Sequence, residues 1–370
     1  MIIKRFRAES FRNIEKCDIE FSPGVNLLHG KNAQGKTNAM EGIYLFSRGR
    51  SFRGKDDSEL MMMGSEGFRI AIEYEDRSGE QSLEYAHIGK DRLRKKNGYK
   101  ISRVAEMIGS FRAVLFYPDN LSLVKDGPEE RRAFLNIACA NIYPSYIKIY
   151  ADYKKALENR NCLLKFANKG YFFDERELAS WSESMAEYAS HIYIARAEYT
   201  EMLERFSRDI LLEISDGKEE LTLLYKSDIE KRETDRLAVR EEYRRLLTEN
   251  ISKEIGAGIT LYGPHRDDID IRLSGISARS FASQGQQRSI VLAMKLGEGE
   301  VCREISGEYP VFLFDDVLSE LDEQRRRYVL TSSKERQIII TSCEKNYKNI
   351  PAERIIEVSD GKYSVTYNKE

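Results

Sequence analysis

The 370-residue sequence has no run of 18 apolar residues, so no segment is long and apolar enough to cross a membrane as a helix. Residues 1–7 mix basic and apolar side chains without the apolar core or the cleavage site of a signal peptide. The five cysteines are scattered and form no C-x-x-C pair, which argues against a zinc site or a disulfide framework. We therefore expect a cytoplasmic protein with reduced thiols and no membrane partner.

The sequence also lacks an excess of positive charge. It has 59 Lys and Arg residues against 61 Asp and Glu residues, which gives a net charge of −2. This balance argues against a globally basic nucleic-acid binder, so any DNA contact must come from local clusters of Lys and Arg. Three segments are locally basic, residues 48–55, 92–96 and 325–327, and each is either a DNA contact or an ordinary solvated surface.

What the sequence does contain is a glycine-rich loop, residues 30–37, that fits the P-loop pattern G-x-x-x-x-G-K-[ST]. It lies between a strand-like stretch at 24–29 and a helical pattern at 38–46. Strand, loop and helix N-terminus together form an anion cradle, because backbone N–H groups and the helix dipole both favour phosphate. We expect Lys36 to reach the β- and γ-phosphates of ATP and Thr37 to bind Mg²⁺. A chance glycine loop is the alternative. The predicted nucleotide-binding residues of this segment are Gly30, Lys31, Asn32, Ala33, Gln34, Gly35, Lys36, Thr37 and Asn38.

A second segment, residues 311–316, is an apolar run that ends in two carboxylates. This pattern predicts a buried parallel strand that carries its acids to the carboxyl edge of a sheet, where ligands bind in α/β folds. Asp315 suits the Mg²⁺ shell of a P-loop nucleotide, and Asp316 could orient or deprotonate an attacking water. The alternative is a strand that ends in a solvated acidic turn.

A third segment places Ser283, Gly285 and Gln286 before an apolar helical stretch at 290–296. A serine and a glycine at the start of a helix form another anion site, built from a hydroxyl and backbone N–H groups. Taken alone the motif has little specificity, since S-x-G before a helix is also a common N-cap.

Antiparallel strands are predicted around the P-loop. Residues 3–28 predict two strands around a turn, and residues 68–74 alternate with the period of a half-buried strand. Further strands are expected at 82–88 and 92–101, the latter broken by the hairpin turn Asn97-Gly98.

From residue 126 to about 215 the sequence is mostly helical, with a strand at 221–225 and a helix at 235–251 beyond it. Apolar residues step by three and four along 174–212, which predicts one helix about 58 Å long with a heptad seam that packs into a core. This helix belongs either to a protruding arm or to an ordinary bundle. The seam consists of Leu178, Trp181, Met185, Tyr188, Ile192, Ala195, Tyr199, Met202 and Phe206.

The order of these motifs resembles that of ATP-binding-cassette (ABC) heads, in the branch that includes SMC-type and DNA-repair ATPases. More narrowly, the chain resembles the RecF family of bacterial recombinational-repair proteins over almost its whole length. The segments that carry the resemblance are Phe11-Arg12-Asn13, Gly30 to Asn38, Gly49-Arg50-Ser51-Phe52-Arg53, Pro118-Asp119-Asn120-Leu121, Gly127 to Arg132, Gly263-Pro264-His265-Arg266-Asp267-Asp268, the Ser283 segment and Phe314 to Asp322.

The resemblance implies an α/β fold: an ABC-type P-loop ATPase head with a mixed β-sheet and an antiparallel β subdomain, plus an inserted, mainly helical arm. The head would comprise residues 1–120 and 255–370, and the arm residues 121–254. The resemblance and the motifs together imply that ATP and Mg²⁺ are the cofactors and that ATP drives formation of a homodimer. Each ATP would lie between the P-loop of one subunit and the Ser283 segment of the other. Lys36 and Asp316 would be catalytic, and Thr37 and Asp315 would hold Mg²⁺.

The implied partner is double-stranded DNA, at gaps or single-strand/duplex junctions, with RecR and RecO as protein partners in repair and replication-fork recovery. Slow ATP hydrolysis, in a weak DNA-dependent ATPase, would release the clamp. An ATPase subunit of an ABC transporter is the alternative function, although the long helical insertion argues against it. An SMC-like structural protein is disfavoured because the arm is too short for a long coiled coil, and a nuclease fusion because no further acidic domain remains.

Three positions depart from the patterns of related heads. Ala33 stands where the family has glycine, and we expect it to have φ below zero. Asp316 stands where a glutamate is frequent and is one methylene shorter, so we expect slow turnover. Thr341-Ser342 follow the predicted strand 337–340 at the place of a histidine switch.

The segment 263–268 contains a histidine and three charged residues. His265 is either structural or catalytic, and the structural role is the simpler one. Arg266 could form an ion pair with Asp267 or Asp268, which would be either structural or directed at the nucleotide.

Overall fold

The structure is a computed structural model that describes residues 1–54, 56–229, 232–331, 335–344 and 350–367. By its internal contacts the chain divides into two compact units. The first unit comprises residues 1–121, 209–219 and 283–370, and the second comprises residues 122–208 and 220–282. Residues 255–282, which the sequence prediction placed with the head, group with the second unit. The predicted functional division into head and arm stays a prediction.

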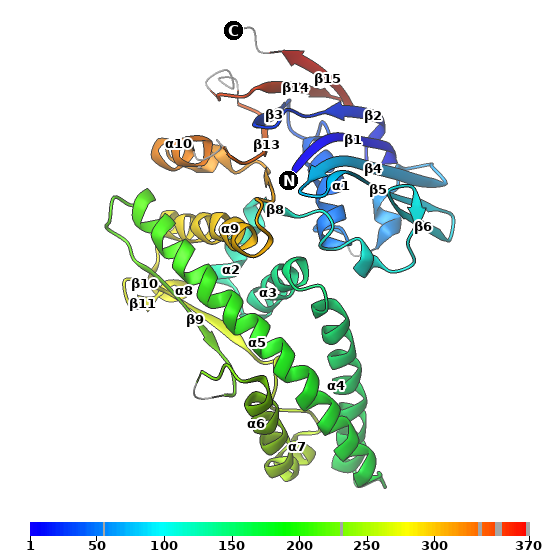
Figure 1. Cartoon of the computed structure of the whole chain (residues 1–370), viewed down its shortest axis with the longest axis vertical. Coiled ribbons are helices and arrows are strands. Elements are labelled where there is room, and N and C mark those ends of the chain that lie inside the picture. Colours follow the sequence, from blue (N-terminus) through cyan, green and yellow to red (C-terminus); the bar gives the residue numbers. More distant parts are fainter. Residues whose placement is uncertain (55, 230–231, 332–334, 345–349, 368–370) are drawn as a thin grey trace. The chain divides into compact units, whose positions relative to one another are not determined.

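The first unit contains a six-stranded sheet in the order β15-β14-β3-β13-β12-β8 (Figure 1). The central strands are parallel and buried on both faces, which explains the apolar runs 113–116, 311–314 and 338–340. The predicted strands 24–29 and 311–314 are confirmed. The strands are β3 (Val25–His29), β8 (Ala113–Phe116), β12 (Val311–Phe314), β13 (Ile338–Ser342), β14 (Arg354–Ser359) and β15 (Lys362–Tyr367).

A second, antiparallel sheet of the first unit runs in the order β2-β1-β4-β5-β6-β7. The prediction of two strands within 3–28 is wrong, because Arg12 turns the chain at a positive φ of 56° without glycine or proline and so creates a third strand. The Asn97-Gly98 turn is confirmed, with φ of 51° and 79° and Lys96 paired with Tyr99. The strands are β1 (Ile2–Phe11), β2 (Ile14–Glu20), β4 (Gly67–Asp76), β5 (Gly79–Ile88), β6 (Asp91–Lys96) and β7 (Tyr99–Lys100).

Helix α1 (Lys36–Arg48) belongs to the same buried core as both sheets, together with Phe6 of β1 and Leu313 of β12. A Cβ on Gly42 of this helix would come within 2.6 Å of the Phe6 ring, so glycine permits the close approach of helix and strand. The other helical elements of the unit are α9 (Gln284–Ser306), α10 (Glu323–Thr331), η1 (Asp57–Leu60), η2 (Val104–Glu106), η3 (Pro118–Leu121) and η4 (Leu318–Glu320).

The second unit is mainly helical and holds a small antiparallel sheet in the order β11-β10-β9. The predicted helix 235–251 is divided at Asn250 into α6 and α7. The long helix α5 runs from Glu175 to Ile214, as predicted, and its last residues group with the first unit. The remaining elements are α2 (Ser122–Lys125), α3 (Pro128–Ile142), α4 (Tyr146–Asn168), β9 (Leu221–Lys226), α6 (Arg236–Glu249), α7 (Ile251–Ala257), β10 (Asp268–Leu273), β11 (Ile276–Ser277) and α8 (Ala278–Phe281).

The buried stripe of α5 lies to one side of the predicted heptad seam. The seam residues that are only partly buried are Trp181, Tyr188, Ala195, Met202 and Phe206. The fully buried stripe instead contains polar side chains, which a count of apolar positions does not register. These buried polar residues are Ser190, Arg196, Thr200 and Ser207.

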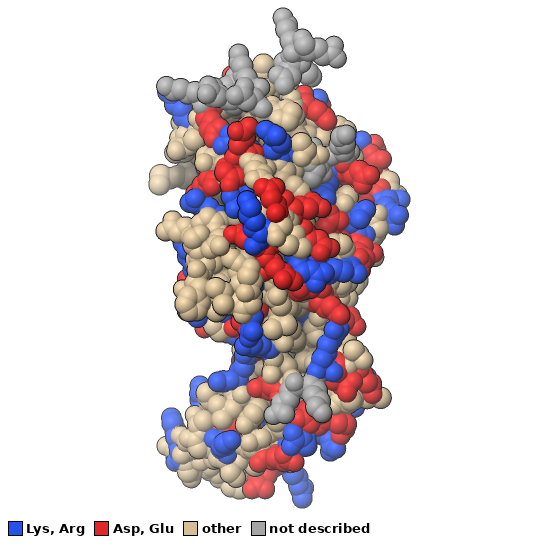
Figure 2. Space-filling model, turned by 90° about the vertical axis from the view of Figure 1, so that its left-hand side faces the viewer, with Lys and Arg blue, Asp and Glu red and all other residues tan. Residues whose placement is uncertain are grey.

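Charges of both signs share the surface. On the face drawn in Figure 2, Lys and Arg side chains alternate with Asp and Glu, and neither sign covers the face alone. Within the described part of the chain, no helix is both long and apolar enough to cross a membrane.

Candidate nucleotide site

The P-loop connects β3 to α1, as its sequence predicts. Gly35 occupies the N-cap position of α1 with φ of 117°, and its side-chain-free backbone leaves the helix N-terminus open. The Lys36 ammonium donates to the carbonyls of Gly30 (2.8 Å) and Lys31 (3.0 Å), so it folds back over the loop. A helix N-terminus and a cation therefore gather at one loop, which is the composition of a phosphate site.

Ala33 adopts a left-handed conformation with φ of 64°, so the expectation of a negative φ is wrong. The path of the loop requires a left-handed backbone at position 33, and contacts with neighbouring residues keep Ala33 in that conformation. One of these is a long hydrogen bond of 3.5 Å from Asn13 Nδ2 to the Ala33 carbonyl. A non-glycine residue in this region costs about 1–2 kcal/mol.

The two predicted Mg²⁺ ligands meet in space, although they lie far apart in the sequence. Thr37 Oγ1 donates to Asp315 Oδ1 at 3.0 Å, and Asp315 follows the buried strand β12. Burial raises the pKa of Asp315 above its ordinary value, while hydrogen bonds from Thr341 and Thr37 oppose the rise. A hydroxyl and a carboxylate are hard oxygen donors of the kind that Mg²⁺ takes beside a nucleotide, so the donor set fits the ion.

Thr341, at the end of β13, joins the two aspartates. Its Oγ1 donates to Asp315 Oδ1 at 2.8 Å and accepts from the backbone N–H of Asp316 at 2.8 Å. Asp316 itself has a positive φ of 53°, so the chain bends sharply between the carboxylates. Sequence reasoning noted only that no histidine stands at this position and missed the bridging hydroxyl.

Sequence reasoning also missed a charge network under the P-loop helix. Glu41 of α1 is fully buried and accepts from Arg12 at 2.7 and 2.9 Å and from the Ser51 hydroxyl. Arg53 donates to Asn38 Oδ1 at 2.9 Å in the first turn of α1. The network brings the segments 11–13 and 49–53, which carry the family resemblance, to the nucleotide loop. A single acid within the otherwise apolar stretch 39–46 of α1 was the available signal.

The Ser283 segment begins helix α9, as predicted. Ser283 is the N-cap and forms a capping box with Gln286, whose side chain also donates to Glu219 at 2.9 Å. Ser283 and Gly285 are exposed, and a Cβ at Gly285 would meet no atom within 4 Å. The segment is thus an accessible helix N-terminus, and its contact with nucleotide stays a prediction.

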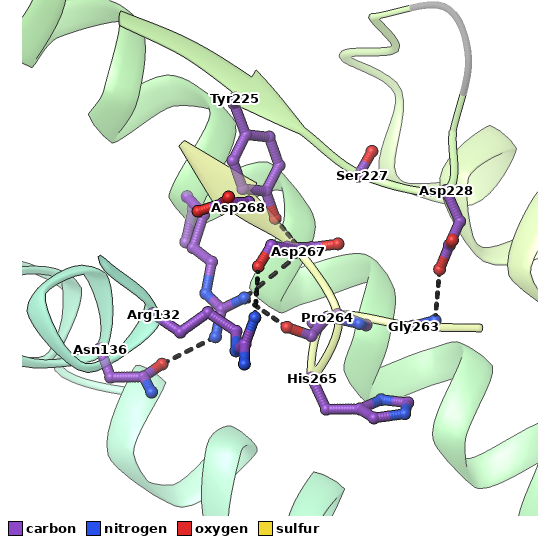
Figure 3. Close-up of polar contacts among 12 residues, drawn as sticks. Arg132, Asn136, Tyr225, Ser227, Asp228, Gly263, Pro264, His265, Asp267 and Asp268 are labelled. Carbon is purple, nitrogen blue, oxygen red and sulfur yellow. Dashed lines mark hydrogen bonds and ion pairs between the residues drawn. The ribbon is translucent and has the colours of Figure 1, made fainter. Parts of the chain in front are cut away.

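The segment 263–268 lies in the second unit, where it forms a buried polar cluster (Figure 3). Arg196 of α5 donates to the carbonyl of Pro264 at 2.7 Å and to Asp267 Oδ2 at 3.3 Å. Tyr225 of β9 also donates to Asp267. Asp268 pairs with Arg131 at 2.6 Å. The predicted ion pair of Arg266 is therefore wrong, because other arginines, distant in sequence, occupy both carboxylates.

His265 has both ring nitrogens in hydrogen bonds, to Tyr153 at 2.6 Å and to the carbonyl of Thr260 at 3.2 Å. Since a carbonyl only accepts, Nε2 carries the proton and Nδ1 accepts from the tyrosine. Burial lowers the pKa of His265 to about 4, so the ring stays neutral. These contacts support the structural role.

These features define the class of protein: an ABC-type ATPase head of the SMC-like branch. The family model described as "RecF/RecN/SMC N terminal domain" matches residues 2–366. The chain is also similar in fold to an Smc head domain of Pyrococcus furiosus, with a TM-score of 0.60, 20% identity, and coverage of 100% of this chain and 96% of the other.

Within that class, the chain belongs to the RecF family. It is 36% identical to the "DNA replication and repair protein RecF" of Clostridioides difficile, covering 97% of this chain and 96% of the relative. It is 38% identical to the RecF of Desulfitobacterium hafniense, covering 98% of each. A solved RecF described as "the recombination mediator protein RecF-ATPrS in RecFOR pathway" superposes with a TM-score of 0.91 at 34% identity, over 98% of this chain and 97% of that one.

Proposed function

We propose that this protein is an ATP-dependent DNA-binding protein of recombinational repair and replication-fork recovery. The observation that carries the proposal is the hydrogen-bonded set of Thr37, Asp315 and Thr341 beside a P-loop whose lysine is already folded over it. Solved RecF relatives described with ATP and with ATPrS support the choice of nucleotide. Family membership argues against a transporter ATPase subunit.

Each residue of the site has a role in binding or hydrolysing ATP that follows from its position. The loop Gly30–Asn38 binds the phosphates, and Lys36 neutralises their charge. Thr37 and Asp315 hold Mg²⁺, which when bound polarises the phosphate oxygens. Asp316 orients the attacking water, and its shorter side chain accounts for slow hydrolysis.

The second half of the site comes from another copy of the chain. Ser283, Gly285 and Gln286 present an exposed helix N-terminus that attracts the γ-phosphate of the partner's ATP. ATP then becomes part of a homodimer interface, and hydrolysis removes the contact. In other nucleotide-binding proteins, contacts with the γ-phosphate order a segment, and hydrolysis releases it.

The dimer holds double-stranded DNA, near gaps or single-strand/duplex junctions, mainly through phosphates. DNA stimulates its weak ATPase activity, and RecR and RecO act with it. The relative described as part of the RecFOR pathway supports these partners. The protein acts in the cytoplasm.

Of the three basic segments, the β6–β7 hairpin suits DNA best. On α10, Arg325, Arg326 and Arg327 each pair with an acid. At 48–55, Arg53 approaches Glu41 at 3.7 Å. In and next to the hairpin, residues 90–103 have one acid, Asp91, against seven basic residues. Arg92 and Lys95 pair with acids of other segments, Asp57 at 3.0 Å and Glu84 at 3.5 Å. The segment favours DNA by its excess of basic residues, which are Lys90, Arg92, Arg94, Lys95, Lys96, Lys100 and Arg103.

Sedimentation of wild type and Ser283→Arg, with and without ATP and duplex DNA, tests the proposal. Wild type should form an ATP-dependent dimer that retains DNA, and the bulky cation at position 283 should abolish the dimer. A Ser283→Arg protein that still dimerises with ATP shows that the cross-subunit site is wrong. Lys36→Met should lose ATP-dependent DNA retention, and unchanged retention counts against the switch.

A further inference from the structure

The turn between β14 and β15 lies against the P-loop, although more than 300 residues separate them in the sequence. The backbone N–H of Gly361 donates to the Gln34 carbonyl at 2.9 Å, and that of Asp360 donates to Gln34 Oε1 at 2.5 Å. The Tyr363 hydroxyl donates to the Gly35 carbonyl at 2.9 Å. The β14–β15 turn near the end of the described chain therefore contacts Gln34 and Gly35 of the P-loop.

The shape of this turn follows from its sequence. Asp360 and Gly361 have φ of 49° and 72°, and they connect the paired residues Ser359 and Lys362. A two-residue hairpin loop of this kind requires positive φ at both positions, which Asp-Gly tolerates. Both central N–H groups point out of the hairpin, where they meet the main chain and the side chain of Gln34.

Asn13 completes the arrangement from the β1–β2 turn. Its Nδ2 approaches the Ala33 carbonyl at 3.5 Å, and its own carbonyl would lie 2.3 Å from a Cβ on Gly361. A Cβ on Gly35 would meet Asn13 Oδ1 at 3.0 Å and Tyr363 OH at 3.1 Å. The two turns and the loop are therefore in tight mutual contact, with glycine at the closest points. We call Asn13, Asp360, Gly361 and Tyr363 the latch.

The latch contacts three consecutive P-loop carbonyls, those of Ala33, Gln34 and Gly35. In a planar trans peptide, the C=O of one residue and the N–H of the next point in opposite directions. Carbonyls directed at the latch therefore direct the N–H groups of Gln34, Gly35 and Lys36 away from it. Successive N–H groups with a common direction form an anion-binding nest.

We infer that the latch sets the direction of these P-loop N–H groups before nucleotide arrives, and that Asn13, Gly361 and Tyr363 are positioning residues for the phosphates. The inference rests on the proposed nucleotide function. Tyr363 contributes one neutral hydrogen bond, which limits its effect to about five-fold in affinity. Burial raises the pKa of Tyr363, so its hydroxyl remains a donor at physiological pH.

The test is the affinity of Tyr363→Phe for ATP and for ADP, measured by calorimetry on the full chain. We expect both dissociation constants to rise about five-fold, because both nucleotides present phosphates to the same loop. The matched control is Tyr74→Phe, which removes a tyrosine hydroxyl that donates to the Ser110 carbonyl at 3.1 Å in the same unit, away from the P-loop. Both variants should lose similar thermal stability, while only Tyr363→Phe should lose affinity.

An unchanged affinity in Tyr363→Phe, or an equal loss in Tyr74→Phe, overturns the inference. Gly361→Ala provides a second variant, since its Cβ would collide with the Asn13 carbonyl, and it should weaken nucleotide binding more than Tyr363→Phe does. A wild-type chain that binds neither nucleotide would instead contradict the proposed function.

Discussion

Ala33 has a backbone conformation in the P-loop that alanine itself disfavours. Its φ of 64° is a conformation that glycine adopts freely and alanine does not. The strain persists because the neighbouring contacts of the P-loop determine the backbone more strongly than the residue's own preference.

Ala33→Gly should therefore stabilise the protein, by about 0.5–1 kcal/mol after the greater flexibility of unfolded glycine is subtracted. Urea unfolding measures the change. The matched control is Ala39→Gly in the first turn of α1, where φ is helical and glycine should destabilise by about 1 kcal/mol. A destabilised Ala33→Gly protein would contradict the argument.

Thr341 is the second informative residue, since its hydroxyl supports both aspartates. Thr341→Val keeps the shape but leaves the Asp316 N–H without this acceptor and Asp315 without one donor. Loss of such a supporting hydrogen bond typically costs about 10–100-fold in activity. We expect that loss in steady-state ATP hydrolysis, whereas ATP affinity should change little. Thr341→Ser should retain hydrolysis, and equal loss in both variants would argue against the hydroxyl's role.

At the scale of elements, helix α5 brings Arg196 against Asp267 beside β10. Burial raises the pKa of Asp267 from 3.8 to about 6, although Arg196 and Tyr225 oppose the rise. Between these two pH values the folded protein binds more protons than the unfolded chain. Stability contributed by this group is therefore present below pH 4 and falls as pH rises toward 6.

Unfolding free energy measured from pH 4 to pH 6 should thus fall less steeply with rising pH in Asp267→Asn than in wild type. The variant is expected to be less stable at pH 7, because it leaves the buried Arg196 without a charged partner. The difference in slope is the diagnostic quantity, and parallel pH profiles would assign the titration to another group.

Elements with local patterns were predictable from the sequence, and the contacts between them were not. The P-loop, the strand before Asp315 and the length of α5 each follow from neighbouring residues. Thr341 and the latch act through hydrogen bonds across the sheet, which no local pattern encodes. The third N-terminal strand was missed because the Arg12-Asn13 turn contains neither glycine nor proline. The buried stripe of α5 was displaced by Arg196, a residue that apolar periodicity excludes.

At the scale of the whole molecule, a net charge of −2 leaves DNA binding to a local surface. The β6–β7 hairpin places Lys95 directly opposite Lys100. Like charges in that position destabilise a hairpin, and the phosphates of the proposed DNA partner would relieve this repulsion. Glu84 offsets only part of the charge, at 3.5 Å from Lys95.

Lys95→Glu combined with Lys100→Glu should weaken duplex DNA binding and reduce the slope of log affinity against log salt by about 2, because two lysines no longer neutralise phosphates. Filter binding over a salt series measures both. Arg327→Glu is the control, because this exposed arginine already pairs with Glu323 on α10. If the control loses as much affinity as the hairpin variant, the hairpin does not bind the DNA.

The sheet order also has a consequence for synthesis. Strand β3, which carries the P-loop, pairs with β13 and β14, and these follow it by about three hundred residues. At about 5–20 residues per second, a ribosome needs roughly 15–60 s to supply them. During that time an apolar strand near the N-terminus has no partners, while the inserted second unit can already fold. The nascent chain should therefore depend on chaperones until its last strands emerge.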